Sequence, residues 1–183
     1  IPILKSKRER GIRYPEKSIW WRKAEMVGKD SIAYEYIIRR IGGGFGFGGD
    51  YPYPDSVVKN VLNRKQDWGN VVVVEDVTGS MYPYITQTLV WRRLAIKEDT
   101  LSQFLFFNDG DKRPDGPIGK SGGTYPIESK RVRPVEKKVE EAMENGSGGQ
   151  TPENDLEACL AGLKAFPDVE GIVLIADNWA PIR

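Results

Sequence analysis

Three oxygen-bearing side chains stand at alternate positions near the middle of the chain: Asp76, Thr78 and Ser80. Because a turn can aim alternate side chains at one point, these oxygens could bind a single ion. Carboxylate and hydroxyl oxygens are hard ligands, which suit Mg²⁺, Mn²⁺ or Ca²⁺ better than zinc. The simpler alternative is that Asp76 only closes a turn and that the two hydroxyls only cap a helix.

Two further positions carry matching chemistry. Thr151 follows a glycine-rich turn, and with Pro152 and Glu153 behind it the pattern predicts the start of a helix. Asp177 stands at the end of the apolar run 171–176. If the strands before Asp76 and Asp177 are parallel neighbours, all these oxygens meet at the carboxyl edge of one sheet, where ligands of open α/β sheets bind.

Composition excludes several kinds of chemistry. The chain of 183 residues has no histidine, so it can build neither a Ser-His-Asp triad, nor a His-zinc site, nor a histidine general base. Its single cysteine, Cys159, cannot form an internal disulfide and leaves the redox compartment open. A net charge of +1 indicates no general attraction to nucleic acid. No apolar run approaches the roughly 20 residues of a membrane span.

The elements that must position the candidate ligands can be predicted from the pattern of apolar residues. Four consecutive valines at 71–74 indicate a fully buried, parallel strand that runs directly into Asp76. The runs 103–107 and 171–176 predict two more buried strands. Tyr125-Pro126-Ile127 fits a short edge strand, where proline is tolerated.

Helices are predicted between these strands. A short one carries Val57, Val58, Val61 and Leu62, a second begins near Tyr82, and a third extends from Val132 and stops at Asn145-Gly146. In a fourth, after Thr151, one apolar stripe combines Leu156, Cys159, Leu160 and Leu163. We interpret Cys159 as a core residue rather than a reactive thiol.

Three other motifs are weaker. Gly44, Gly46 and Gly49 have the spacing of a dinucleotide fingerprint, but they follow a predicted helix and lead into Tyr-Pro-Tyr-Pro, so we interpret them as a loop. Asp109, Asp111 and Asp115 resemble part of a calcium loop without its closing glutamate, which favours a solvated turn. The sequence Gly119-Lys120-Ser121 imitates the end of a phosphate-binding loop, but the glycine that should open it is Pro114.

Residues 1–67 are predicted to form an N-terminal extension. Residues 1–23 contain eight Lys/Arg residues against two Glu. A functional interpretation is a basic arm for an acidic partner or a membrane surface. We favour the alternative, a solvated extension laid over the domain and anchored by Trp20 and Trp21.

The combination of Asp76-x-Thr78-x-Ser80, then Thr151, then Asp177 resembles the von Willebrand factor A (VWA) domain and its metal-ion-dependent adhesion site. The resemblance covers residues 68–183. It implies a doubly wound, Rossmann-type α/β fold whose mostly parallel central sheet is flanked by helices. With the right-handed crossover rule, it also implies that the strands at 71–76, 103–107 and 171–176 lie side by side and parallel, with the first in the middle. It also implies that the C-terminal part of the fold is missing here, because family members continue after the strand that ends at Asp177 with further helices and at least one more strand.

The resemblance further implies that Thr78, Ser80 and Thr151 hold Mg²⁺, or else Mn²⁺ or Ca²⁺, and that Asp76 and Asp177 act directly or through water. The implied function is adhesion-type protein binding without turnover, in which an Asp or Glu carboxylate of a partner protein completes the ion's coordination. One alternative is a metal-dependent hydrolase such as a haloacid-dehalogenase-type phosphatase, but that family needs Asp-x-Asp and Thr78 stands where its second acid would be. Another is a scaffold domain that does not use its metal site. The compartment, extracytoplasmic or cytoplasmic, stays open.

Overall fold

A computed structural model describes residues 57–64, 68–94, 101–111, 122–146 and 154–177. By its packing the chain divides into two units, Ile1–Tyr51 and Pro52–Arg183, and every described residue belongs to the second unit. The basic arm of residues 1–23, the glycine-rich stretch 42–49 and Thr151 lie outside the described residues. So do Asp115 and the stretch 119–121.

Four strands form one mixed sheet in the order β3-β2-β1-β4. They are β1 (Val71–Asp76), β2 (Gln103–Phe107), β3 (Thr124–Glu128) and β4 (Gly171–Ile175). β1 pairs in parallel with both β2 and β4, and β3 pairs antiparallel with β2. The predicted arrangement is therefore confirmed: three parallel strands lie side by side with the valine-rich strand in the middle, and Pro126 lies in an edge strand.

The register of β1 and β4 is direct, with Val71 opposite Gly171 and Glu75 opposite Ile175. Two hydrogen bonds fix its start: the Glu170 amide donates to the Asn70 carbonyl at 2.6 Å, and the Asn70 amide donates to Glu170 Oε2 at 3.3 Å. All six residues of β1 are buried, as expected for a central parallel strand. The residues of β4 are only half-buried or exposed, so the prediction of a buried strand at 171–176 was wrong about its burial, because β4 lies at the edge of the described sheet.

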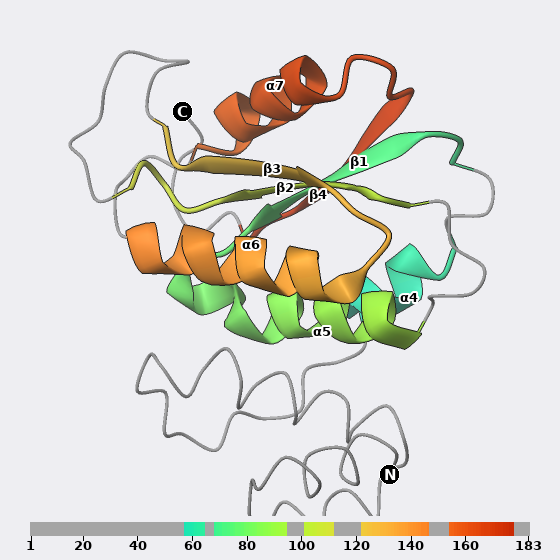
Figure 1. The fold of residues 1–183 in the computed structure, drawn as a ribbon, viewed down its shortest axis with the longest axis horizontal. Coiled ribbons are helices and arrows are strands. Elements are labelled where there is room, and N and C mark those ends of the chain that lie inside the picture. The colour runs from blue at the N-terminus through green and yellow to red at the C-terminus, as the bar shows by residue number, and fades with distance from the viewer. Residues whose placement is uncertain (1–56, 65–67, 95–100, 112–121, 147–153, 178–183) are drawn as a thin grey trace, which may run out of the picture. The chain divides into compact units, whose positions relative to one another are not determined.

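Helices cover both faces of this sheet (Figure 1). α4 (Val57–Leu62), α5 (Tyr82–Leu94) and α6 (Val132–Asn145) lie on one side, and α7 (Asp155–Ala165) lies on the other. A short 3₁₀ helix, η2 (Gly79–Met81), links β1 to α5. No described helix is both long enough and apolar enough to cross a membrane. The described residues thus form a mostly parallel α/β sheet with helices on both faces.

Four apolar residues on one face of α6 are buried, Val135, Val139, Ala142 and Met143, whereas Val132 at its start is half-buried. The helix stops where expected, and the Gly146 amide donates to the Ala142 carbonyl at 3.2 Å. α4 is fastened to α5 by two hydrogen bonds across the helix pair. The Val58 amide donates to Gln87 Oε1 at 2.9 Å, and Trp91 Nε1 donates to Asn63 Oδ1 at 3.0 Å.

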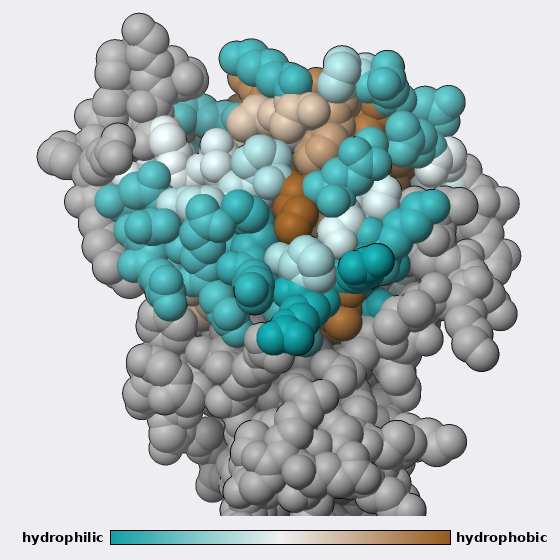
Figure 2. Space-filling model, viewed as in Figure 1, coloured by the Kyte–Doolittle hydropathy of each residue, from teal (hydrophilic) through white to brown (hydrophobic). Residues whose placement is uncertain are grey.

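α7 does not place its apolar stripe against the sheet. Leu156, Leu160 and Leu163 are exposed, and Cys159 is half-buried at the edge of the core. The residues that meet β1 are small: Ala158 is fully buried, and a Cβ added at Gly162 would lie 3.2 Å from Val74 Cγ2. Close approach of the helix to β1 thus selects its smallest side chains. In Figure 2 hydrophilic residues cover most of α6, whereas hydrophobic residues are visible around α7.

Candidate metal site

Asp76 is the last residue of β1, and its side chain lies on the face of the sheet that α7 covers. Val72 and Val74 pack against Ala158 of α7 in one core cluster, and strand alternation puts Asp76 on the same side. The Asp76 residue is only 1% exposed. The chain is then held to β2, because the Val77 amide donates to the Phe107 carbonyl at 2.8 Å.

The Asp76 carboxylate and Thr78 lie in direct contact. The Thr78 amide donates to Asp76 Oδ1 at 2.7 Å, and the Thr78 hydroxyl donates to Asp76 Oδ2 at 3.0 Å. Although Thr78 occupies the N-cap of η2, its side chain makes no capping hydrogen bond. The Thr78 hydroxyl is therefore directed to the carboxylate and not to the start of the helix.

Ser80 and Asp177 lie near the same edge but toward solvent. Ser80 lies in η2 and is exposed. Asp177 follows β4 and is also exposed, and since Glu75 pairs with Ile175, it lies one residue beyond the position level with Asp76. The structure thus brings Asp76 and Thr78 into contact, places Ser80 in the following turn and Asp177 at the end of the neighbouring strand, and leaves Thr151 undescribed.

The N-terminus of α7 adds two polar residues that were not among the predicted ligands. Asn154 and Asp155 are each 2% exposed, and among the described residues neither Oδ1 atom has a hydrogen-bond partner. Burial, together with the negative charge of Asp177, raises the pKa of Asp155. The Asn154 amide donates to Asp109 Oδ1 at 3.5 Å, which links α7 to the turn after β2.

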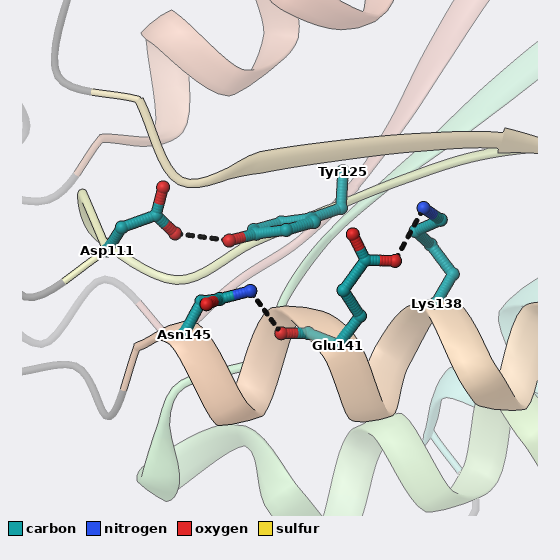
Figure 3. Close-up of polar contacts among 5 residues, drawn as sticks. All are labelled: Asp111, Tyr125, Lys138, Glu141 and Asn145. Carbon is teal, nitrogen blue, oxygen red and sulfur yellow. Dashed lines mark hydrogen bonds and ion pairs between the residues drawn. The ribbon is translucent and has the colours of Figure 1, made fainter.

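That turn is structural rather than solvated. Asp109 is 4% exposed, with a positive φ of 56° that aspartate tolerates better than most residues. Asp111 accepts hydrogen bonds from the Gly123 amide, from Asn108 Nδ2 and from the Tyr125 hydroxyl, the last drawn in Figure 3. Burial and contact with Asp111 raise the pKa of Tyr125 to about 12. Turn chemistry was predicted correctly, but the burial of Asp109 was not.

The same close-up shows how α6 ends beside this turn (Figure 3). Asn145 Nδ2 donates to the Glu141 carbonyl at 2.9 Å. One turn earlier, Lys138 and Glu141 form an exposed ion pair at 2.7 Å. These contacts close the helix and are of the surface type that adds little stability.

Glu75 is a buried acid that the sequence interpretation missed. It is fully buried on the opposite face of β1 from Asp76, and the Thr88 hydroxyl of α5 donates to its Oε1 at 2.8 Å. Burial raises the pKa of Glu75 to about 8; the Thr88 hydrogen bond opposes this shift and the charge of Asp76 adds to it. Strand alternation with Val71 and Val73 could have indicated this position.

Within the described ranges, no three Asp, Glu or Cys side chains are grouped so that they could hold an ion. Compared with known proteins, the chain matches no family model, no curated protein and no solved structure. Functional inference for this chain therefore depends on the chemistry of the carboxyl edge itself.

Proposed function

We propose that residues 68–183 form a VWA-like domain that binds Mg²⁺, or Mn²⁺ or Ca²⁺ in its place, and uses the ion to bind a carboxylate of a partner protein. The proposed ligand set is Asp76, Thr78, Ser80, Thr151 and Asp177. The observation that carries the proposal is the contact of Asp76 with Thr78 at the carboxyl end of a central strand that has a parallel neighbour on each side. Open α/β sheets bind ligands at this location.

The spacing of the two oxygens fits a small octahedral ion. Asp76 Oδ2 and Thr78 Oγ1 are 3.0 Å apart. Adjacent ligands of an octahedral Mg²⁺ are also about 3 Å apart, because each lies about 2.1 Å from the ion at right angles to the other. A rotation of the Thr78 hydroxyl proton would turn it away from Asp76 Oδ2 without moving either residue.

The charge and exposure of the site favour an external anionic ligand. The proposed set has three neutral hydroxyls and two carboxylates, and carboxylates that act through water neutralise an ion only in part. Ser80 and Asp177 are exposed, whereas Asp76 and Thr78 are buried, so the solvent side of the site is the side open to a partner. A protein Asp or Glu is the simplest hard anion to fill a remaining position.

Metal binding is tested by thermal unfolding with and without Mg²⁺. A ligand that binds only the folded state stabilises it by about 2.7 kcal/mol at a hundred times its dissociation constant. Asp76→Ala and Asp177→Ala should abolish the rise in melting temperature. Asp168→Ala, an exposed aspartate at the opposite edge, should keep it. An Mg²⁺ response that is the same in all four proteins would exclude the assigned site.

The functional class is tested by two measurements on the Mg²⁺-loaded protein. Binding of a partner or peptide carboxylate should be lost in EDTA and should survive moderate salt, because coordination at about 2 Å is screened far less than contacts over a Debye length of about 8 Å. Hydrolysis of a generic phosphate ester that disappears in Asp76→Ala would contradict the binding module and support a hydrolase.

A further inference from the structure

Two neighbouring residues at the start of α7 are buried hydrogen-bond acceptors for which the described residues supply no donor. Asn154 and Asp155 are each 2% exposed, and neither Oδ1 atom has a partner in the described part of the chain. Asn154 holds the N-cap position of α7, yet its side chain makes no capping hydrogen bond. Leaving a buried polar atom without a partner is costly, so these atoms favour another donor, such as a bound water.

The N-terminus of α7 lies at the carboxyl edge of the sheet. Beyond the other end of the helix, Asn70 Nδ2 donates to the Asp168 carbonyl at 3.0 Å, which places the chain after α7 beside the start of β1. At the N-terminus, the Asn154 amide contacts Asp109 in the turn that follows β2. α7 therefore runs antiparallel to β1, and its first turn lies at the same edge as Asp76.

Asp155 belongs to the row of α7 residues that faces β1. Asp155, Ala158 and Gly162 are spaced i, i+3 and i+7, which puts them on one side of a helix. Ala158 packs with Val72 and Val74 in the core cluster. A Cβ added at Gly162 would lie 3.2 Å from Val74 Cγ2 and 3.6 Å from Val72 Cγ1. The row thus consists of small residues over the valines and ends, toward the N-terminus, in a carboxyl group.

Along the sheet, Asp155 comes level with Asp76. Gly162 lies opposite the segment 72–74, and Asp155 is seven residues before it, which is about 10.5 Å along a helix. Asp76 is three residues beyond the middle of that segment, which is about 10 Å along a strand. Burial and, to a smaller extent, the negative charge of Asp177 raise the pKa of Asp155, so Asp177 is also near. Asp155 therefore faces the space beside two of the proposed ligands.

This position suits contact with an ion through water rather than direct coordination. Nowhere in the described part of the chain are three Asp, Glu or Cys side chains grouped so that they could bind one ion directly. Mg²⁺ keeps several of its water ligands when it binds to a protein, and the protons of these waters need acceptors. An acceptor that is already buried, with no donor among the described residues, is positioned to take such a hydrogen bond.

We propose that Asp155 is a positioning residue of the proposed metal site, and that its carboxyl group accepts a hydrogen bond from a water molecule bound to the ion. The inference rests on the proposed function, because it requires an ion at Asp76 and Thr78. It adds a residue from the first turn of α7 that was not in the ligand set expected from the sequence. It also gives the buried Asp155 Oδ1 atom a donor.

The inference is tested by measuring Mg²⁺ affinity by calorimetry on the full chain. Asp155→Ala removes the acceptor, and Asp155→Leu removes it while keeping a side chain of similar size. Each should weaken Mg²⁺ binding about 10–100-fold, the usual effect of losing a residue that supports the ligands of a metal. Asp155→Asn keeps an oxygen that can accept a hydrogen bond, so it should recover part of the loss.

Glu157→Ala is the matched control. Glu157 is the other acid in the first turn of α7, and a residue two positions from Asp155 lies on a different side of the helix. The variant removes an acid from the same turn without removing the acceptor beside the site. It should change Mg²⁺ affinity by less than about fivefold, the scale of one charge at a helix N-terminus.

Thermal unfolding in EDTA separates a role at the metal from a purely structural one. Because Asp155 Oδ1 has no partner among the described residues, replacing it removes no hydrogen bond from the metal-free protein. The melting temperature of Asp155→Leu in EDTA should therefore be no lower than that of the wild type, whereas its rise in Mg²⁺ should be smaller. An earlier melting in EDTA together with unchanged Mg²⁺ affinity would make Asp155 structural and overturn the inference.

Failure of the inference is distinguishable from failure of the proposed function. The inference is overturned and the proposed function stands if Asp155→Leu binds Mg²⁺ as tightly as the wild type, or if Glu157→Ala loses as much affinity. The same holds if Asp155→Asn recovers none of the loss. If the wild type does not bind Mg²⁺, or if Asp76→Ala binds it equally well, the proposed function fails and the inference fails with it.

Discussion

Glu75 lies between β1 and α5 with Thr88 as its hydrogen-bond donor, and its Oε2 has no partner among the described residues. Its pKa is about 8 in the folded protein against an ordinary value of 4.5. The folded state therefore holds this proton over a pH range in which the unfolded state has lost it. The contribution of protonated Glu75 to the free energy of unfolding is fully present below about pH 4.5. It is lost as pH rises toward 8, by about 1.4 kcal/mol per pH unit.

Glu75→Gln should remove this dependence, because an amide of the same shape can still accept the Thr88 hydrogen bond but does not ionise. At pH 7 we expect the variant to be more stable than the wild type, by up to roughly 3 kcal/mol. Urea unfolding between pH 5 and 8.5 measures the effect. The exposed Glu128→Gln is the matched control and should follow the wild-type curve. Parallel curves for wild type and Glu75→Gln would show that Glu75 does not carry the dependence.

At the scale of the element, we expect substitutions at two nearby positions of α7 to have different effects on stability. Gly162→Val should destabilise the protein by about 1–3 kcal/mol, because its side chain would be forced into Val72 and Val74. Leu160→Gln should change the free energy of unfolding by less than about 0.5 kcal/mol, since Leu160 is exposed. Denaturant unfolding of both variants checks the orientation of the helix, and a larger loss at Leu160 would contradict it.

The strands could be predicted from their apolar residues, whereas the orientation of α7 could not. A central parallel strand needs apolar residues on both faces. Four consecutive valines, as in β1, meet that need and fit few other elements. The leucine stripe of α7 is equally apolar, but the helix approaches β1 so closely that Ala158 and Gly162 are selected instead. That selection depends on the distance between two elements, which local periodicity does not contain.

The candidate site also has a part that could be predicted from the sequence and a part that could not. Contact between Asp76 and Thr78 was predictable because both belong to one turn after one strand. The buried Asp109 accepts a hydrogen bond from the Asn154 amide, 45 residues further along, and the buried Glu75 accepts one from the Thr88 hydroxyl of α5. Contacts between distant segments therefore decided which acids are buried. The rule that placed Asp76 at the carboxyl edge of the sheet also applies to the turn after β2, so it could have indicated Asp109 as a residue of that edge.

At the scale of the whole molecule, stability should be uneven across the sheet. β1 has strands on both sides and every residue buried, whereas the residues of β4 are half-buried or exposed and β3 is an antiparallel edge strand with Pro126 in it. Amide exchange in β1 should therefore be the slowest of the four strands, and exchange in β3 and β4 should be faster. Hydrogen–deuterium exchange followed by mass spectrometry measures this order. Equal protection of β1 and β4 would contradict it.

The pairing of β4 with β1 also affects how the chain must be made. Asn70 and Glu170, which fix the start of that pairing, are 100 residues apart in sequence. At a synthesis rate of about 5–20 residues per second, β1 leaves the ribosome about 5–20 seconds before its β4 partner exists. For that time one edge of a strand with four consecutive valines has no native neighbour, and such an edge can pair with another chain. During the period between the synthesis of these two strands, the nascent protein is thus open to aggregation through this edge.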